Sequence, residues 1–228
     1  MFNSVKSAAA DFAGRCPGLR KLMLRRQCKQ HPLAGDRAVE WSWIVSHLPG
    51  HPSKVLDLGC VESSLTGIAW RLGHSVTSVD LREIEYDMPN LVFLKQDVNS
   101  LDFRQEPFDV IMNCSMIEHV GLPDRYGSSQ VCDGDLLAMR QMATWLAKNG
   151  TMLLTIPVGQ DGLFAPYHRV YGPQRLPALL ESYRIIEQEY WHKDASAKWR
   201  LCEKDAALAT QGRKDFYALG LFVLGGRP

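Results

Sequence analysis

The chain has 228 residues, of which 46% are hydrophobic, so it is long enough for one sizeable core and short for two full domains. Its 26 basic and 25 acidic side chains give a formal net charge of +1, which does not favour a nucleic-acid or polyanion partner. Its apolar runs fall short of the roughly 20 residues that a membrane-spanning helix needs, and its six cysteines form no C-x-x-C pair, so we expect a soluble, cytoplasmic protein.

The N-terminal segment differs from the rest in charge. No acidic residue occurs from Gly14 to Gly35, whereas basic residues cluster there with leucines. We expect residues 1–36 to form a basic helical segment that is part of the main domain or caps it, and residues 37–228 to form that domain. An alternative is that the stretch 15–29 contacts an anionic surface, such as a membrane periphery.

Short apolar runs after this segment predict the buried strands of a parallel sheet. The runs are 54–58, 75–80, 91–95, 108–114 and 151–156. A helical pattern with Leu65, Ile68, Ala69 and Leu72 follows the first run and ends at Gly73, and a second extends from residue 134 to the stop signal Asn149-Gly150. Strands that alternate with helices predict an α/β sheet covered on both faces.

The C-terminal part predicts a helix at about 174–181 and strands at 183–190 and 217–224. No good crossover helix separates these two strands, so we expect them to pair antiparallel and to close one edge of the sheet.

The turn after the first strand is the first candidate for a ligand site, because ligands of such sheets bind outside the carboxyl ends of the strands. A dinucleotide fingerprint requires G-x-G-x-x-G, whereas this turn reads G-C-V-E-S-S. Val61 would block the close approach of a pyrophosphate, and Glu62 would place a negative charge beside it. The turn therefore disfavours a cofactor bound through phosphate.

Carboxylates at the strand ends suit a nucleoside that carries a positive charge instead. Asp80 follows Gly59 at about the 20-residue distance at which an acidic residue meets ribose hydroxyls. Asp97 could accept a hydrogen bond from an adenine amino group, and Asp57 could contribute negative potential near an ammonium or a sulfonium. These features together describe S-adenosylmethionine.

The ordered motifs resemble those of the class I S-adenosylmethionine-dependent methyltransferases. "VLDLGC" resembles the first motif, "VTSVDL" the ribose-binding motif, "FLKQDV" the adenine-binding motif and "FDVIMNCSMIEHV" the fourth strand and its turn, while "LAKNGTMLLTIPVG" is similar to the entry into the fifth strand. The resemblance covers roughly residues 37–190 and implies a Rossmann-like, seven-stranded, doubly wound α/β sheet with an antiparallel last strand. It implies cofactor contacts by Asp57, Gly59, Cys60, Asp80, Leu81, Asp97, Val98, Cys114, Ser115 and Glu118. The chain departs from the family at the later glycines of the first motif, where Val61 and Ser63 stand.

Two histidines are candidate catalytic residues. His119 follows the fourth strand, where acceptor and sulfonium meet in the family, and an imidazole can take a proton near neutral pH. Glu118 could orient it, and the alternative is that His119 only packs against the cofactor. His168 lies in "FAPYHRVYG", where Arg169 could hold a carboxylate or phosphate; the alternative is a rim loop anchored by its tyrosines.

The long loop 121–135 contains Asp133 and Asp135, which we interpret as caps of the following helix. An alternative is a metal site formed with His119, although we predict no metal. We expect Cys60 and Cys114 to be packing thiols that line the cofactor pocket.

We predict a methyltransferase that acts on a small molecule, and more finely O-methylation of a sugar-like or secondary-metabolite hydroxyl. The finer prediction depends on "DLGCVESSL", "IEHVG", "DGD" and "YHRVY", which are similar to bacterial methyltransferases of glycan or natural-product biosynthesis. The alternatives are a non-catalytic, cofactor-binding interaction protein and a nicotinamide-dependent oxidoreductase, whose glycine-rich turn and Tyr-x-x-x-Lys pair are absent. The acceptor and the oligomeric state stay open.

Overall fold

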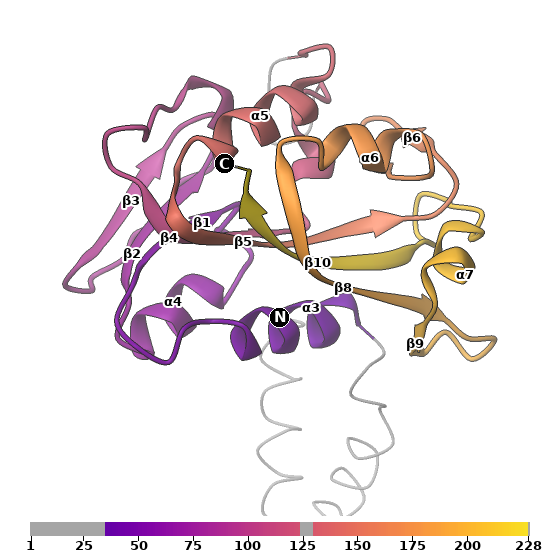
Figure 1. Ribbon diagram of the computed structural model, residues 1–228, viewed down its shortest axis with the longest axis horizontal. Helices are drawn as coiled ribbons and strands as arrows, with labels where there is room; N and C mark the ends of the chain where they lie inside the picture. Colours follow the sequence, from indigo (N-terminus) through magenta and orange to yellow (C-terminus); the bar gives the residue numbers. More distant parts are fainter. Residues whose placement is uncertain (1–34, 124–129, 228) are drawn as a thin grey trace, which may run out of the picture.

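A single mixed sheet organises the chain, as Figure 1 shows. The computed structural model describes residues 35–123 and 130–227, so the basic stretch 15–29 and the segment 124–129 lie outside the described residues. The strand order is β3-β2-β1-β4-β5-β10-β8-β9. The strands are β1 (Lys54–Leu58), β2 (Ser75–Asp80), β3 (Leu91–Lys95), β4 (Phe108–Cys114), β5 (Leu146–Val158), β8 (Tyr183–Lys193), β9 (Trp199–Cys202) and β10 (Ala218–Gly226).

The first five strands of the sheet are parallel, and the late strands are not. β1 pairs in parallel with β2 and β4, β2 with β3, and β4 with β5. β10 runs antiparallel to both β5 and β8, which confirms the expected antiparallel pairing of the two late strands. The bounds predicted for β1, β2, β3 and β4 agree with the observed ones.

The sheet has eight strands, because β9 adds an edge strand beyond the seven that were predicted. β9 forms an antiparallel hairpin with β8, closed by a turn in which Asp194 accepts hydrogen bonds from the backbone N–H groups of Ser196 and Lys198, at 2.8 and 3.1 Å. Only Trp199 of this four-residue strand is buried. A strand this short, with one buried residue in a polar stretch, gives almost no periodic signal.

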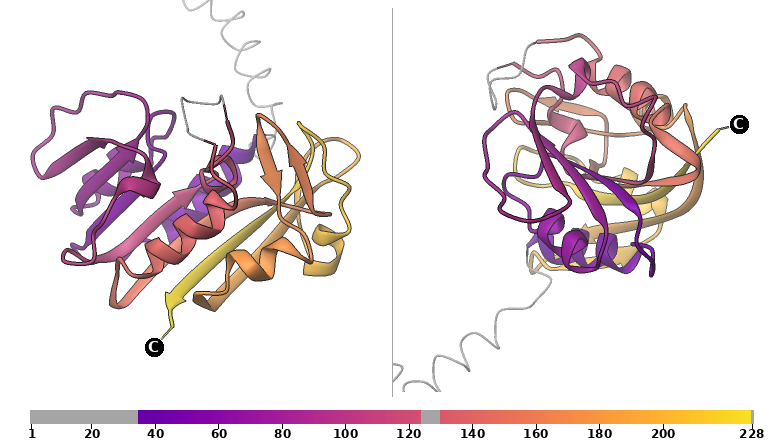
Figure 2. Two further views of the ribbon diagram at one scale, coloured as in Figure 1. Left: turned by 90° about the horizontal axis from the view of Figure 1, so that it is seen from above. Right: turned by 90° about the vertical axis from the view of Figure 1, so that its left-hand side faces the viewer.

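Helices cover both faces of the sheet (Figures 1 and 2). α3 (Asp36–Ser46) and α4 (Leu65–Arg71) lie on one face, and α5 (Gly134–Ala143) and α6 (Arg175–Leu179) lie on the other. α7 (Lys204–Leu208) contacts β8 and β10, and the short hairpin β6 (Gly162–Phe164) and β7 (His168–Val170) follows β5. Two single-turn 3₁₀ helices, η1 (Val98–Ser100) and η2 (Ile117–His119), follow β3 and β4.

Two details of the predicted helices are wrong. Leu72, expected on the buried face of α4, is 53% exposed at the C-cap, although Leu65 and Ala69 are buried and Gly73 turns with φ +92° as expected. α5 ends at Ala143 and not at Asn149-Gly150. Trp145 stops it, because its side chain is fully buried and its carbonyl accepts a hydrogen bond from the Phe108 N–H at 2.8 Å, which starts β5.

Candidate functional site

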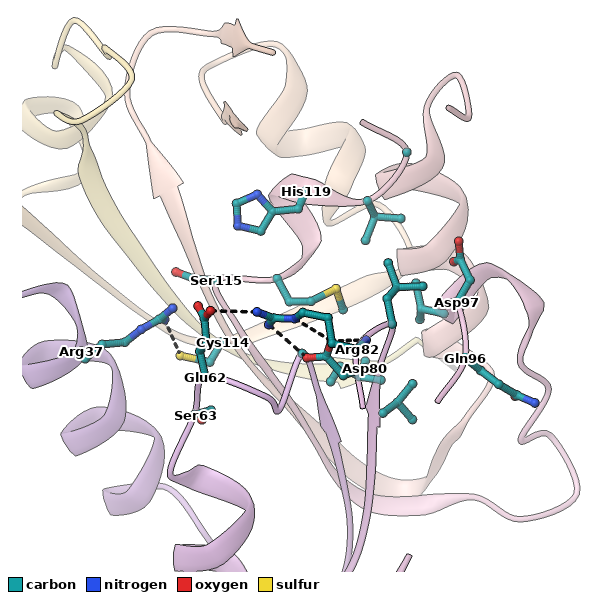
Figure 3. A pocket seen from close by; sticks show the side chains of 18 residues that line it. Arg37, Glu62, Ser63, Asp80, Arg82, Gln96, Asp97, Cys114, Ser115 and His119 are labelled. Carbon is teal, nitrogen blue, oxygen red and sulfur yellow. Dashed lines mark hydrogen bonds and ion pairs between the residues drawn. The ribbon is translucent and has the colours of Figure 1, made fainter. Parts of the chain in front are cut away.

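A pocket lies at the carboxyl ends of β1, β2 and β4, the edge at which the sequence predicts a ligand (Figure 3). The space between its walls measures about 970 Å³, open solvent at its mouth included. Most of the predicted site residues line it. They are Gly59, Asp80, Leu81, Asp97, Val98, Cys114, Ser115 and His119.

The turn at Gly59 is shaped by its neighbour in the site. Gly59 adopts φ +78°, and a Cβ added there would lie 2.7 Å from Cγ of Met116. Its backbone N–H donates to the carbonyl of Val79 at 2.8 Å, which joins the ends of β1 and β2. Only glycine takes this conformation without strain, so one glycine is enough to bring the turn close to the segment that follows β4.

Asp57 lies behind this turn and does not line the pocket. Its Oδ2 accepts a hydrogen bond from the Thr66 hydroxyl at 2.5 Å, which ties β1 to α4, while Oδ1 is buried and has no hydrogen-bond partner among the described residues. The pKa of Asp57 is raised to about 6, mainly by burial; the Thr66 hydrogen bond opposes this rise and the charge of Asp80 adds to it. When ionised, Asp57 therefore contributes a buried negative charge behind the Gly59 turn without lining the pocket.

One end of the pocket is acidic. The Asp80 carboxylate accepts hydrogen bonds from the Val61 N–H at 2.9 Å and from Nε of Arg82 at 3.2 Å. Nη1 of Arg82 reaches Glu62 at 2.8 Å, so this arginine bridges the two carboxylates (Figure 3). Asp97 lies farther along the same end, where its Oδ1 also caps η1 through the Asn99 N–H at 2.9 Å.

The opposite end of the pocket carries Arg37, which comes from α3 (Figure 3). Its Nη1 lies 3.0 Å from Oε2 of Glu40 and 3.6 Å from Sγ of Cys114. Glu40 is fully buried and accepts hydrogen bonds from the hydroxyls of Ser115 and Thr155, the latter at 2.8 Å. α3 thus completes the site through a buried carboxylate that fixes the turn after β4.

His119 lines the pocket from η2. Its Nδ1 lies 2.5 Å from the carbonyl oxygen of Tyr167, and its Nε2 lies 3.7 Å from Oε1 of Glu118. Because a carbonyl can only accept, Nδ1 carries a hydrogen in this contact. Glu118 is buried and does not line the pocket. Its carboxylate lies beside the imidazole of His119.

The structure does not bring His168 into the pocket lining. His168 is buried, with its ring 5.6 Å from that of Phe164 and 5.3 Å from that of Tyr217. Arg169 is buried as well, and its Nη1 donates to the carbonyl of Val120 at 2.7 Å. Of the two possibilities given for Arg169, its burial and this contact do not support a ligand carboxylate or phosphate, because its guanidinium faces the protein interior.

Asp133 and Asp135 do not cap α5 with their side chains. Asp133 stands at the N-cap with φ +53° but pairs with Arg175 at 2.9 Å, and the buried Asp135 pairs with Arg175 at 2.6 Å. Within residues 35–123 and 130–227, no group of three or more His, Cys, Asp or Glu side chains is arranged to hold a metal ion. The alternative metal site with His119 does not form there.

The two cysteines near the site are buried thiols. Burial raises the pKa of Cys60 to about 12 and that of Cys114 well above its usual value, so both are protonated near neutral pH. Cys114 lines the pocket, whereas Cys60 lies outside the lining.

Sequence reasoning missed several residues of the lining. Arg82 had a local signal, because it stands two residues after the acidic strand end. Met116 lies within "FDVIMNCSMIEHV" but was given no role. Arg37 had no signal, since only the packing of α3 against β4 brings it to the pocket.

Across the part of the chain that is described, no helix is both long and apolar enough to cross a bilayer.

Comparison with known proteins gives a family and a fold. Residues 79–215 match the model of the family described as "Caenorhabditis protein of unknown function, DUF268". The chain is 28% identical over 118 residues to the ubiquinone biosynthesis O-methyltransferase of Stutzerimonas stutzeri (strain A1501), covering 47% of this chain and 50% of the relative. It is 30% identical over 103 residues to the enzyme of the same name from Nitrosococcus oceani, covering 40% and 43%. The match spans about half the length of these curated relatives or less.

Two crystal structures show a similar arrangement. One is the 1,6-didemethyltoxoflavin-N1-methyltransferase of Burkholderia thailandensis with bound 1,6-didemethyltoxoflavin and S-adenosylhomocysteine, with a TM-score of 0.56 and 17% identity over 99% of this chain and 90% of that one. The other is the N-methyltransferase NodS of Bradyrhizobium japonicum WM9 in complex with S-adenosyl-l-homocysteine, with a TM-score of 0.56 and 13% identity over 89% and 91%. At these identities the likeness shows the fold, and it confirms the predicted α/β class with an antiparallel last strand.

Proposed function

The chain belongs to the family described as "Caenorhabditis protein of unknown function, DUF268", and from its site we propose that it is an S-adenosylmethionine-dependent methyltransferase with a small-molecule acceptor. The observation that carries this proposal is the polarity of the pocket, which Gly59 also lines: Asp80 and Asp97 lie at one end and Arg37 at the other. The names of the relatives, ubiquinone biosynthesis O-methyltransferases, support the same reaction class.

The residues that line the pocket fit this cofactor in charge. Asp80 would accept from the ribose hydroxyls and Asp97 from the adenine amino group, as carboxylates at the ends of the second and third strands can. Arg37 would pair with the carboxylate of the amino-acid end, and the buried charge of Asp57 would favour the ammonium and the sulfonium. When bound, S-adenosylmethionine supplies a methyl group activated by its sulfonium.

The chain's own contribution to the reaction would be alignment and one proton transfer. The lone pair on Nε2 of His119 would take the proton of an acceptor hydroxyl, and the nearby carboxylate of Glu118 would stabilise the imidazolium that results. We propose O-methylation on this basis, with a sugar-like or secondary-metabolite hydroxyl as the acceptor. His168 takes no part in this proposal, because its side chain packs between two aromatic rings.

The remaining expectations belong to the same proposal. We propose that residues 37–228 form the catalytic domain, that residues 1–36 add to it, that the protein acts in the cytoplasm, and that its partner is a small molecule and not a nucleic acid.

Isothermal titration with S-adenosylhomocysteine tests the cofactor assignment. We expect the full chain to bind it and Asp80→Ala to weaken binding by about 10- to 100-fold, since a hydrogen bond to a charged group contributes about 1.5–3 kcal/mol. Asp87→Asn is the control, because Asp87 is exposed and does not line the pocket. If the unaltered protein does not bind S-adenosylhomocysteine, the proposal is wrong.

A further inference from the structure

The turn that carries His119 is held by a buried arginine. Nη1 of Arg169 donates to the carbonyl of Val120 at 2.7 Å and lies 3.4 Å from the carbonyl of Glu118. These carbonyls belong to the residues on either side of His119. A single guanidinium therefore holds the backbone on both sides of His119, at the end of η2 and at its C-cap.

The charge of this arginine is balanced inside the protein. Its Nε lies 3.6 Å from Oδ2 of Asp135, which is fully buried. Asp135 also accepts hydrogen bonds from the Tyr171 hydroxyl at 3.0 Å and from Arg175 at 2.6 Å. Burying two charges is costly unless each is paired and hydrogen-bonded, and here both conditions are met.

The same hairpin also holds the imidazole itself. Tyr167, whose carbonyl oxygen lies 2.5 Å from Nδ1 of His119, stands just before β7, the strand that contains Arg169. The ring and its backbone are thus fixed by two points of one short segment. Such double support sets both the tautomer and the direction of a histidine.

We infer that Arg169 is a positioning residue for His119, with Asp135 as its charge partner. The inference rests on the proposed function, because it gives a role to the histidine that the proposed reaction uses. Lysine cannot replace this arginine: an ammonium is a point charge on a flexible stem and lacks the rigid fork of donors that meets two carbonyls and a carboxylate together.

The test compares two arginines that share one carboxylate. Arg169→Lys and Arg175→Lys each weaken a contact with Asp135, but the side-chain hydrogen bonds described for Arg175 go to Asp133 and Asp135 alone. ¹⁵N NMR of the histidine side chains, with His119 assigned by its absence in His119→Ala, reports the tautomer and environment of the ring. Thermal unfolding and titration with S-adenosylhomocysteine are measured on the same samples.

We expect Arg169→Lys to shift the His119 nitrogen signals and to reduce the fraction of the ring with hydrogen on Nδ1. In Arg175→Lys these signals should stay in place at a comparable loss of melting temperature. Unchanged His119 signals in folded Arg169→Lys, or an equal shift in both variants, would overturn the inference.

Two provisions keep the result decisive. If Arg169→Lys does not fold, Asp135→Asn decides by the same signals, because it removes the charge that holds Arg169 in place; His119 signals that stay unmoved would then refute the inference. If the unaltered protein binds no S-adenosylhomocysteine, the proposed function fails, while the spectra without ligand still decide whether Arg169 positions His119.

Discussion

The carboxylate of Asp80 lies against the guanidinium of Arg82, with Oδ1 3.2 Å from Nε and Oδ2 3.4 Å from Nη2. The backbone N–H groups of Arg82 and Val61 donate to the same two oxygens, each at 2.9 Å. A carboxylate accepts about four hydrogen bonds, so these four contacts occupy all the acceptor sites of Asp80. Ribose hydroxyls can bind Asp80 only by replacing the two side-chain bonds of Arg82.

Arg82→Ala should therefore bind S-adenosylhomocysteine more tightly, by up to about fivefold. The gain is modest because a partly exposed ion pair contributes about 0.2–1 kcal/mol, and Arg82 keeps a second partner in Glu62 when it leaves Asp80. Lys95→Ala is the matched control, since it removes a positive charge paired with Glu83 outside the pocket lining. Isothermal titration measures both. Weaker binding by Arg82→Ala would mean that the guanidinium contacts the cofactor and does not compete with it.

The strand ends of the site could be predicted from the sequence because their signals are local. Asp80 and Asp97 each follow an apolar run that has the length of a strand, and parallel strands bring such ends to one edge of the sheet. Gly59 was predicted because a strand that stops at a glycine requires a sharp turn. In each case a few neighbouring residues determine the conformation.

The remainder of the site depends on contacts between distant segments. Glu40 joins α3 to Ser115 and Thr155, and nothing in the residues around Glu40 indicates that its side chain is buried. The inward direction of Arg169 could not be predicted for the same reason, because it depends on the buried Asp135 of another segment, whose Oδ2 lies 3.6 Å from its Nε. The predicted end of α5 was also wrong. The sequence pattern around Trp145 fits a helix, but the burial of its side chain in the core ends α5 at Ala143.

Asp57 should make the stability of the protein depend on pH. Burial raises its pKa from 3.8 to about 6, so the folded protein holds this proton more tightly than the unfolded chain. Well below pH 3.8 both states are protonated and this group does not affect stability. As the pH rises from about 4 to 6, the unfolded chain loses the proton while the folded protein keeps it, so the free energy of unfolding falls by up to about 3 kcal/mol and levels off once the folded carboxylate has ionised.

Asp57→Asn removes this dependence and can still accept the Thr66 hydrogen bond. The melting temperature of Asp57→Asn relative to that of the unaltered protein should increase between about pH 4 and pH 6.5 and then level off. Differential scanning calorimetry over this range measures the difference. A difference that is constant with pH would show that Asp57 does not carry the buried charge inferred for it.

Gly59→Ala should destabilise the fold and weaken cofactor binding. The residue has φ +78°, and its new Cβ would meet Cγ and Cβ of Met116 at 2.7 and 3.0 Å. The left-handed conformation alone costs an alanine about 1–2 kcal/mol. Gly67→Ala is the control: Gly67 lies inside α4, no atom of the described residues lies within 4 Å of an added Cβ, and the substitution should raise stability by about 0.5–1 kcal/mol. Urea unfolding measures both, and equal effects would contradict the role given to the Gly59 turn.

His119→Ala should separate turnover from cofactor binding. Loss of a positioned base lowers the rate by about 10²–10⁴-fold, while the carboxylates that would hold the ribose and adenine stay in place, so affinity for S-adenosylhomocysteine should remain within about threefold. Transfer of labelled methyl from S-adenosylmethionine to a panel of hydroxylated small molecules, at saturating cofactor, measures the rate, and calorimetry measures the affinity.

His168→Ala is the control: it removes ring contacts with Phe164 and Tyr217 outside the pocket, so it should lower the melting temperature and leave turnover at saturation largely intact. Normal turnover by His119→Ala at saturation, combined with a large loss of affinity, would make His119 a cofactor-packing residue, and the proton of the acceptor would then have to leave by another group.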